Sequence, residues 1–193
     1  MTDISREKAW QLLCEFTKNK NLRKHGLAVE AAMRKYAQHF DEDEERWGIT
    51  GLIHDFDYEK YPSEEEHPYK GNQILKERDW PEDIRKAIMG HADYTGVERD
   101  TLMAKTLYAV DELTGFIIAV ALVRPTKSIY DVEPRSVKKK FKQKAFAKGV
   151  DRDIIFNGIQ ELDVNETKHI ERVIEALQDI APRLGLEGDY KNE

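Results

Sequence analysis

Residues 101–123, TLMAKTLYAVDELTGFIIAVALV, decide the fold class of this chain of 193 residues. Apolar side chains recur there at intervals of three and four, the spacing of one helix face. We predict a helix that is capped by Asp100, begins at Thr101 and ends before Arg124–Pro125, because proline disfavours helix in the residue before it. Its apolar run 116–123 is far shorter than the roughly 20 residues of a membrane span. We expect this run in a core or at a homodimer face.

The same helical spacing continues on both sides, and no strict alternation lasts longer than about five residues. The sequence therefore predicts an all-α helical bundle that forms a single domain over residues 1–193. Asn21 is expected as an N-cap, and Ser63 with Glu66 as a capping box. The other helices are expected at 4–17, 21–39, from 41–45 through 53, 63–75, 81–91, 152–162 and 166–184.

The composition is that of a globular protein, with 40% hydrophobic and 35% charged residues and a mean hydropathy of −0.70. There is one cysteine, and the first ten residues contain no apolar leader. These features predict a cytoplasmic protein without a membrane partner. The net charge of −6 argues against a large nucleic acid as partner.

Histidine and aspartate residues lie among apolar neighbours on four or five separate predicted helices. Asp111 is the clearest case, because an unpaired carboxylate in the helix 101–123 would be costly to bury and no Lys or Arg lies within five residues of it. Imidazoles combined with carboxylates suit a divalent transition metal better than calcium or magnesium. The candidates are His25, His54, Asp55, His67, His91 and Asp111.

Each of these residues has a plainer alternative. A buried hydrogen-bonded pair would satisfy any of them, and His67 and His91 could instead cap helices or face solvent. The two remaining histidines, His39 and His169, are predicted at exposed helical positions.

The order of the candidates, a lone His, a His-Asp pair and a distant Asp, resembles the HD superfamily of metal-dependent phosphohydrolases over residues 20–125. The resemblance implies a helical metal-binding core in which His25, His54, Asp55 and Asp111 hold a first metal ion. It also implies that His67 and His91 are the additional ligands of binuclear members, with Asp55 bridging two metals. The implied cofactor is one or two divalent ions of Fe, Mn, Co, Ni or Zn, with Mg also open.

The segment 124–148 is strongly basic and begins the C-terminal part, residues 126–193. It carries nine Lys or Arg against two acidic residues, a charge of +7, which leaves −13 for the rest of the chain. We expect it to return across the metal site, with Arg124 and Lys127 on substrate phosphates and Lys138 and Lys139 behind them. Removing Arg124 and Lys127 should then raise KM. A solvated charged helix is the alternative, and sparse aromatic residues disfavour a nucleic-acid interface.

The resulting hypothesis is hydrolysis of a phosphoester or phosphoanhydride in a nucleotide or another small phosphorylated metabolite by a metal-activated water. Asp55 would orient the nucleophile, and Asp57 or Glu59 would move protons. A di-iron oxygenase on a similar scaffold is one alternative. A nucleotide-sensing binding module without turnover is another.

Overall fold

The chain is all-α, as predicted. The computed structural model describes residues 4–188, which contain ten α-helices, two 3₁₀ helices and no strand. The α-helices are α1 (Arg6–Phe16), α2 (Lys20–Phe40), α3 (Glu44–Ile53), α4 (Tyr69–Glu77), α5 (Glu82–Gly90), α6 (Leu102–Leu122), α7 (Pro134–Phe141), α8 (Arg152–Glu161), α9 (Glu166–Asp179) and α10 (Ala181–Leu184). The 3₁₀ helices are η1 (Asp93–Thr95) and η2 (Ile129–Asp131).

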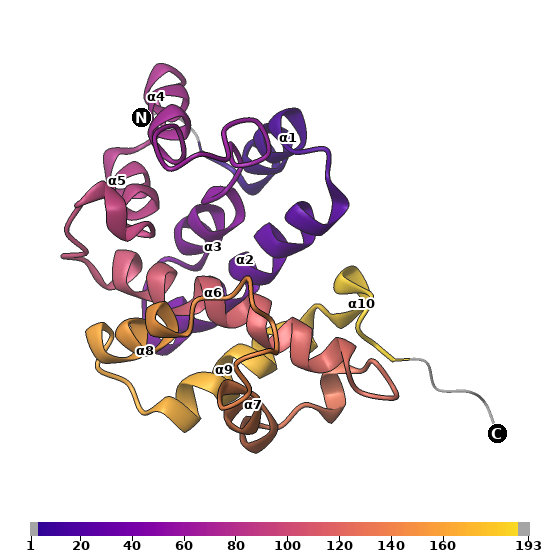
Figure 1. Cartoon of the computed structure of the whole chain (residues 1–193). Helices are drawn as coiled ribbons and strands as arrows, with labels where there is room; N and C mark the ends of the chain where they lie inside the picture. Colours follow the sequence, from indigo (N-terminus) through magenta and orange to yellow (C-terminus); the bar gives the residue numbers. More distant parts are fainter. Residues whose placement is uncertain (1–3, 189–193) are drawn as a thin grey trace.

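Helix α6 crosses the middle of the molecule, with α1, α3, α4 and α5 on one side and α7 and α9 on the other (Figure 1). It packs against α2, α5, α7, α8 and α9. Half of the apolar run 116–123 is buried in this core, namely Phe116, Ile117, Val120 and Ala121, while Leu122 and Val123 at its end are exposed. Among the described residues, no helix has the length and apolar character that crossing a membrane requires.

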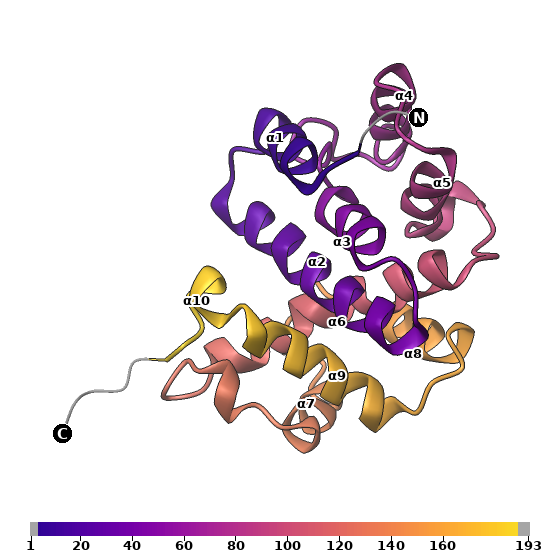
Figure 2. The same ribbon diagram turned by 180° about the vertical axis from the view of Figure 1, so that it is seen from behind.

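Helices α2 and α3 lie side by side and approach each other closely (Figure 2). A Cβ on Gly26 would lie 2.8 Å from the carbonyl oxygen of Leu52, so a side chain there would collide with backbone. This close approach brings His25 of α2 beside His54 at the end of α3, with the two ring centroids 5.1 Å apart.

Several helix ends differ from the prediction because other side chains make the capping hydrogen bonds. Asn19, not Asn21, caps α2, and its side chain accepts from the N–H groups of Asn21 and Leu22. Thr101, not Asp100, caps α6 by accepting from the N–H of Ala104.

Two predicted helices have different extents. Residues 63–67 form turns, so the expected capping box is absent and α4 begins only at Tyr69. The expected helix 166–184 is divided into α9 and α10 at Ile180. Pro182 accounts for the division, because it has no N–H with which to continue the helical hydrogen bonds.

Candidate metal centre

The structure brings the six histidine and aspartate candidates together from five parts of the chain. His25 lies on α2 and Asp111 on α6, while His54 and Asp55 directly follow α3. His67 precedes α4, and His91 directly follows α5. Helix packing therefore places side chains that are up to 86 residues apart in contact.

One group forms around Asp111. Its Oδ1 lies 2.9 Å from Nε2 of His25 and 3.2 Å from Nε2 of His54. Oδ2 of Asp55 lies 3.5 Å from the same His54 nitrogen. His25, His54 and Asp55 offer ligand atoms that all lie within 4.8 Å of one another, a spacing compatible with one metal ion.

A second group forms on the other oxygen of Asp55. Oδ1 lies 3.2 Å from Nε2 of His67 and 3.3 Å from Nε2 of His91. These three residues again offer ligand atoms within 4.8 Å of one another. The two oxygens of one carboxylate thus face two different histidine pairs, which is the arrangement that a bridging carboxylate requires.

The far side of three imidazole rings is held by an acceptor. Nδ1 of His54 donates to the carbonyl oxygen of Gly51 at 2.8 Å, and Nδ1 of His91 donates to that of Ile88. Nδ1 of His67 lies 2.9 Å from Oδ1 of Asp57. A carbonyl oxygen can only accept a hydrogen bond, so the neutral rings of His54 and His91 carry their proton on Nδ1. The lone pair is then on Nε2, the nitrogen that faces Asp55.

One nitrogen of the centre has no hydrogen-bond partner. Nε2 of His54 is buried, and its contact with Asp111 does not have hydrogen-bond geometry. An unsatisfied buried ring nitrogen is costly, and a metal ion would satisfy it. Together with the mixed imidazole and carboxylate donors, this orphaned nitrogen fits a divalent transition metal.

The charges of the carboxylates dominate the electrostatics of the centre. Burial by itself lowers the pKa of His54, but Asp55 and Asp111 outweigh it and raise that pKa to about 10. Burial opposes ionisation of Asp111 as well, yet His54 and His25 hold the pKa of that carboxyl well below its usual range. The centre thus attracts cations strongly, and a metal ion must displace protons from its imidazoles.

Asp57 and Glu59 are not placed to move protons at a substrate. The buried Asp57 contacts Nδ1 of His67 through one oxygen and accepts from the N–H of Gly71 through the other at 2.8 Å. Glu59 accepts from the N–H groups of Lys18 and Asn19, at 2.7 and 2.8 Å. Their placement argues against the catalytic roles that we expected, because both carboxylates are engaged in holding structure.

A cavity of about 450 Å³ opens over the centre. Its lining includes residues that were not predicted from the sequence. Glu112 is one of them, and its position directly after Asp111 is a signal that could have identified it. Burial and the charge of Asp111 raise the pKa of Glu112 to about 7. Besides five of the six candidates, the lining comprises Tyr58, Glu64, Ala92, Asp93, Tyr94, Glu112, Gly115, Val150 and Ile154.

The four basic residues expected at substrate phosphates do not line this cavity. Arg124 and Lys139 line another cavity, at the end of α6 beside α7. Lys127 lies in the turn after α6, and Lys138 pairs with Glu166 at 3.4 Å. Helix α7 packs against α6 and α9, and none of the four cations reaches the cavity lining, so their placement does not support phosphate contacts there.

The two histidines outside the centre differ from each other. His39 is exposed, as predicted. The prediction for His169 is wrong, because it is fully buried, where Nε2 donates to the carbonyl oxygen of Ala109 at 3.0 Å and Nδ1 accepts from the hydroxyl of Tyr36. The apolar face of α9 packs on α2 and α6, and His169 lies on that face.

Comparison with known protein families identifies a domain that contains the centre. Residues 22–115 match the family model of the HD domain. This range begins three residues before His25 and ends four residues after Asp111, so it contains all six residues of the centre. Neither the curated proteins nor the solved structures that were searched gave a match.

Proposed function

We propose that this chain, whose residues 22–115 form an HD domain, is a binuclear metal-dependent phosphohydrolase of small phosphorylated metabolites. The observation that carries the proposal is the position of Asp55. Its Oδ2 faces the group with His25 and His54, and its Oδ1 faces His67 and His91. One carboxylate is thereby available to two ions.

The residues divide into two sets of ligands. His25, His54 and Asp111 would hold one ion, His67 and His91 would hold the other, and Asp55 would bridge them. Bound divalent ions would lower the pKa of a water to near neutrality and offset charge on phosphoryl oxygens. Asp57 keeps the ring of His67 oriented, and the carbonyl groups of Gly51 and Ile88 do the same for His54 and His91.

The cavity lining supports a substrate with little negative charge. Among the described residues that line the cavity there is no Lys or Arg, whereas Glu64, Asp93 and Glu112 add carboxylates. Repulsion from these carboxylates would disfavour a triphosphate more than a monophosphate. The exposed rings of Tyr58 and Tyr94 offer faces for a planar group. A nucleoside monophosphate combines the two properties.

The test measures phosphate release from nucleoside mono-, di- and triphosphates with Mn, Co, Fe(II), Ni or Mg. We expect turnover with at least one metal, monophosphates as the better substrates, and two ions bound per chain. Asp55→Ala should abolish turnover, while Glu59→Gln, which lies outside the cavity, should retain it. No turnover with any substrate in metal-loaded protein, or full activity of Asp55→Ala, would show the proposal to be wrong.

A di-iron oxygenase is a second candidate, because six N and O ligands and a cavity without cationic lining also suit an uncharged substrate. The identity and the redox state of the bound metal test this candidate. An oxygen-sensitive mixed-valence iron pair in the purified protein, seen by electron paramagnetic resonance, would favour the oxygenase. Full hydrolytic activity with a redox-silent metal would exclude it. Tight nucleotide binding without turnover would instead indicate a sensing module.

A further inference from the structure

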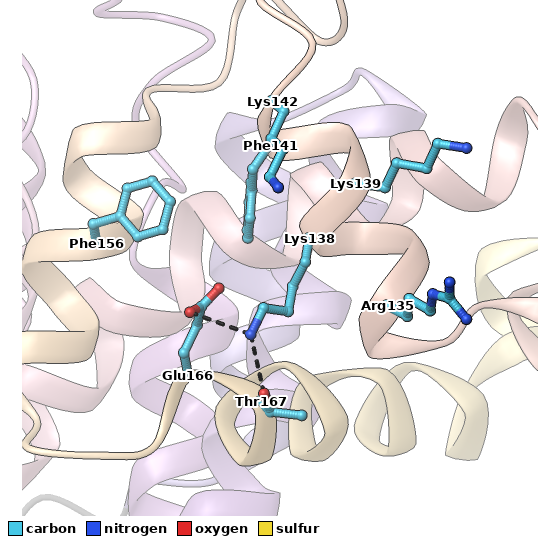
Figure 3. A pocket seen from close by; sticks show the side chains of 8 residues that line it. All are labelled: Arg135, Lys138, Lys139, Phe141, Lys142, Phe156, Glu166 and Thr167. Atoms are coloured by element: carbon cyan, nitrogen blue, oxygen red, sulfur yellow. Dashed lines mark hydrogen bonds and ion pairs between the residues drawn. The ribbon is translucent and has the colours of Figure 1, made fainter.

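A second cavity lies between α7, α8 and the start of α9, apart from the metal centre. This groove has a volume of about 900 Å³, within the range of sites that hold drug-sized ligands. It shares no lining residue with the cavity over the metal centre. Figure 3 shows the lining, which consists of Arg135, Lys138, Lys139, Phe141, Lys142, Phe156, Glu166 and Thr167.

The groove carries uncompensated positive charge. Lys138 is engaged, since its Nζ lies 3.4 Å from Oε2 of Glu166 and 3.2 Å from the hydroxyl of Thr167. The other three cations, Arg135, Lys139 and Lys142, are exposed, and among residues 4–188 no hydrogen bond or ion pair of their side chains is found. They extend from α7 and the residue after it (Figure 3). This part of the chain contributes to the +7 segment 124–148.

One end of the groove is aromatic. Phe156 is 40% exposed, and its ring meets the ring of Phe141 edge-on with centroids 5.3 Å apart. Phe141 in turn stacks on the buried Phe116 of α6 at 4.6 Å. Phe156 is therefore an exposed ring supported by a packed aromatic group, which is what a stacking surface for a base requires.

We propose that this groove binds a nucleoside polyphosphate, with its base on Phe156 and its phosphates among Arg135, Lys139 and Lys142. The groove is much larger than a phosphate ion, and its aromatic end would be unused by inorganic polyphosphate. A nucleic-acid strand would need a series of exposed rings along a basic path, whereas the rest of the chain carries −13. The site is separate from the metal centre and does not depend on hydrolysis there.

The test measures ATP binding by calorimetry in the full-length Asp55→Ala chain with excess chelator, and in parallel in the unmodified chain with chelator. We expect binding in both, weakened at least tenfold by the triple substitution Arg135→Gln, Lys139→Gln and Lys142→Gln. The control Lys20→Gln, Lys76→Gln and Arg183→Gln removes the same charge from exposed positions outside the groove. It should change the affinity less than twofold. Equal losses in both triple variants would overturn the proposal.

A second comparison tests the stacking surface. ATP should bind more tightly than inorganic tripolyphosphate, and Phe156→Ala should remove that preference while Phe156→Leu removes only part of it. Failure of ATP to bind, or tripolyphosphate binding as tightly as ATP, would overturn the proposal. So would a single-stranded oligonucleotide that binds more tightly than ATP. Hydrolysis at the metal centre enters none of these readouts, so this inference and the proposed function can fail independently.

Discussion

At the scale of single residues, Asp57 connects the metal centre to the backbone of α4. Its two oxygens contact Nδ1 of His67 and the N–H of Gly71. Asp57→Asn should weaken binding of the ion held by His67 and His91, because the neutral amide has only one acceptor oxygen for the two donors that the carboxylate satisfies, Nδ1 of His67 and the N–H of Gly71. Partners of this kind typically contribute 10–100-fold in metal affinity. Titration with Co²⁺ should therefore show one tight and one weakened site in the variant.

The matched control is Glu59→Gln, which makes the same chemical change two residues away. Glu59 accepts from two backbone N–H groups and contacts no ligand, so both Co²⁺ sites should stay tight. Two unchanged sites in Asp57→Asn would contradict the assigned role of Asp57.

The six residues of the centre could be identified from the sequence because they are ionisable side chains in apolar stretches of predicted helix. Asp111 stands in an apolar helix, and the histidines recur among apolar neighbours. The role of Asp57 could not be predicted in this way, because it depends on the direction in which the turns after α3 point a side chain. Glu112 could have been predicted beside the centre, because it directly follows Asp111 in the sequence.

At the scale of helices, the α2–α3 contact positions His25 and His54. Gly26→Ala should destabilise the fold by about 1–3 kcal/mol, because its Cβ would lie 2.8 Å from a backbone oxygen that cannot move independently. Gly115→Ala is the control, since its Cβ would meet no atom within 4 Å apart from its chain neighbours and the backbone of its own helix, and alanine favours helix by up to about 1 kcal/mol. Urea unfolding measures both, and equal stability of the two variants would contradict this account.

Helix α9 carries a pH-dependent contribution to stability. Burial lowers the pKa of His169 to about 4, and the nearby charge of Arg172 acts in the same direction. In the unfolded chain His169 becomes protonated near pH 6.5, whereas in the folded chain it stays neutral until the pH is near 4. The contribution to stability is therefore fully present above pH 6.5 and is lost as the pH falls towards 4. Its full size is about 3 kcal/mol.

The measurement compares the unmodified chain with His169→Gln in urea at pH 7.5, 5.5 and 4.5. The difference in unfolding free energy between the two chains should shrink as pH falls. Groups common to both chains, including His39 and Tyr36, cancel in that difference. A difference independent of pH would contradict the role of His169. Sequence periodicity placed α9 correctly, but it did not show that α2 and α6 cover the helix face carrying His169.

At the scale of the whole molecule, the charge is divided between two places. The metal centre and its cavity are acidic, while the basic segment lies at the other cavities. The uneven distribution of charge could be predicted from the sequence, with +7 on residues 124–148 and −13 on the rest of the chain. The sequence could not predict where the basic segment lies, because that depends on how the chain turns at Pro125 and packs along α9. The sequence alone therefore suggested that Arg124 and Lys127 reach the substrate of the centre.

The placement of these residues predicts the opposite kinetic result. Arg124→Gln with Lys127→Gln should leave KM for the best nucleoside monophosphate within about twofold, because neither side chain lines the cavity. Tyr94→Ala is the positive comparison, since its exposed ring lies in the cavity, and it should raise KM. A several-fold rise in KM in the double variant, with Tyr94→Ala unchanged, would show that the substrate approaches from the basic side of the molecule.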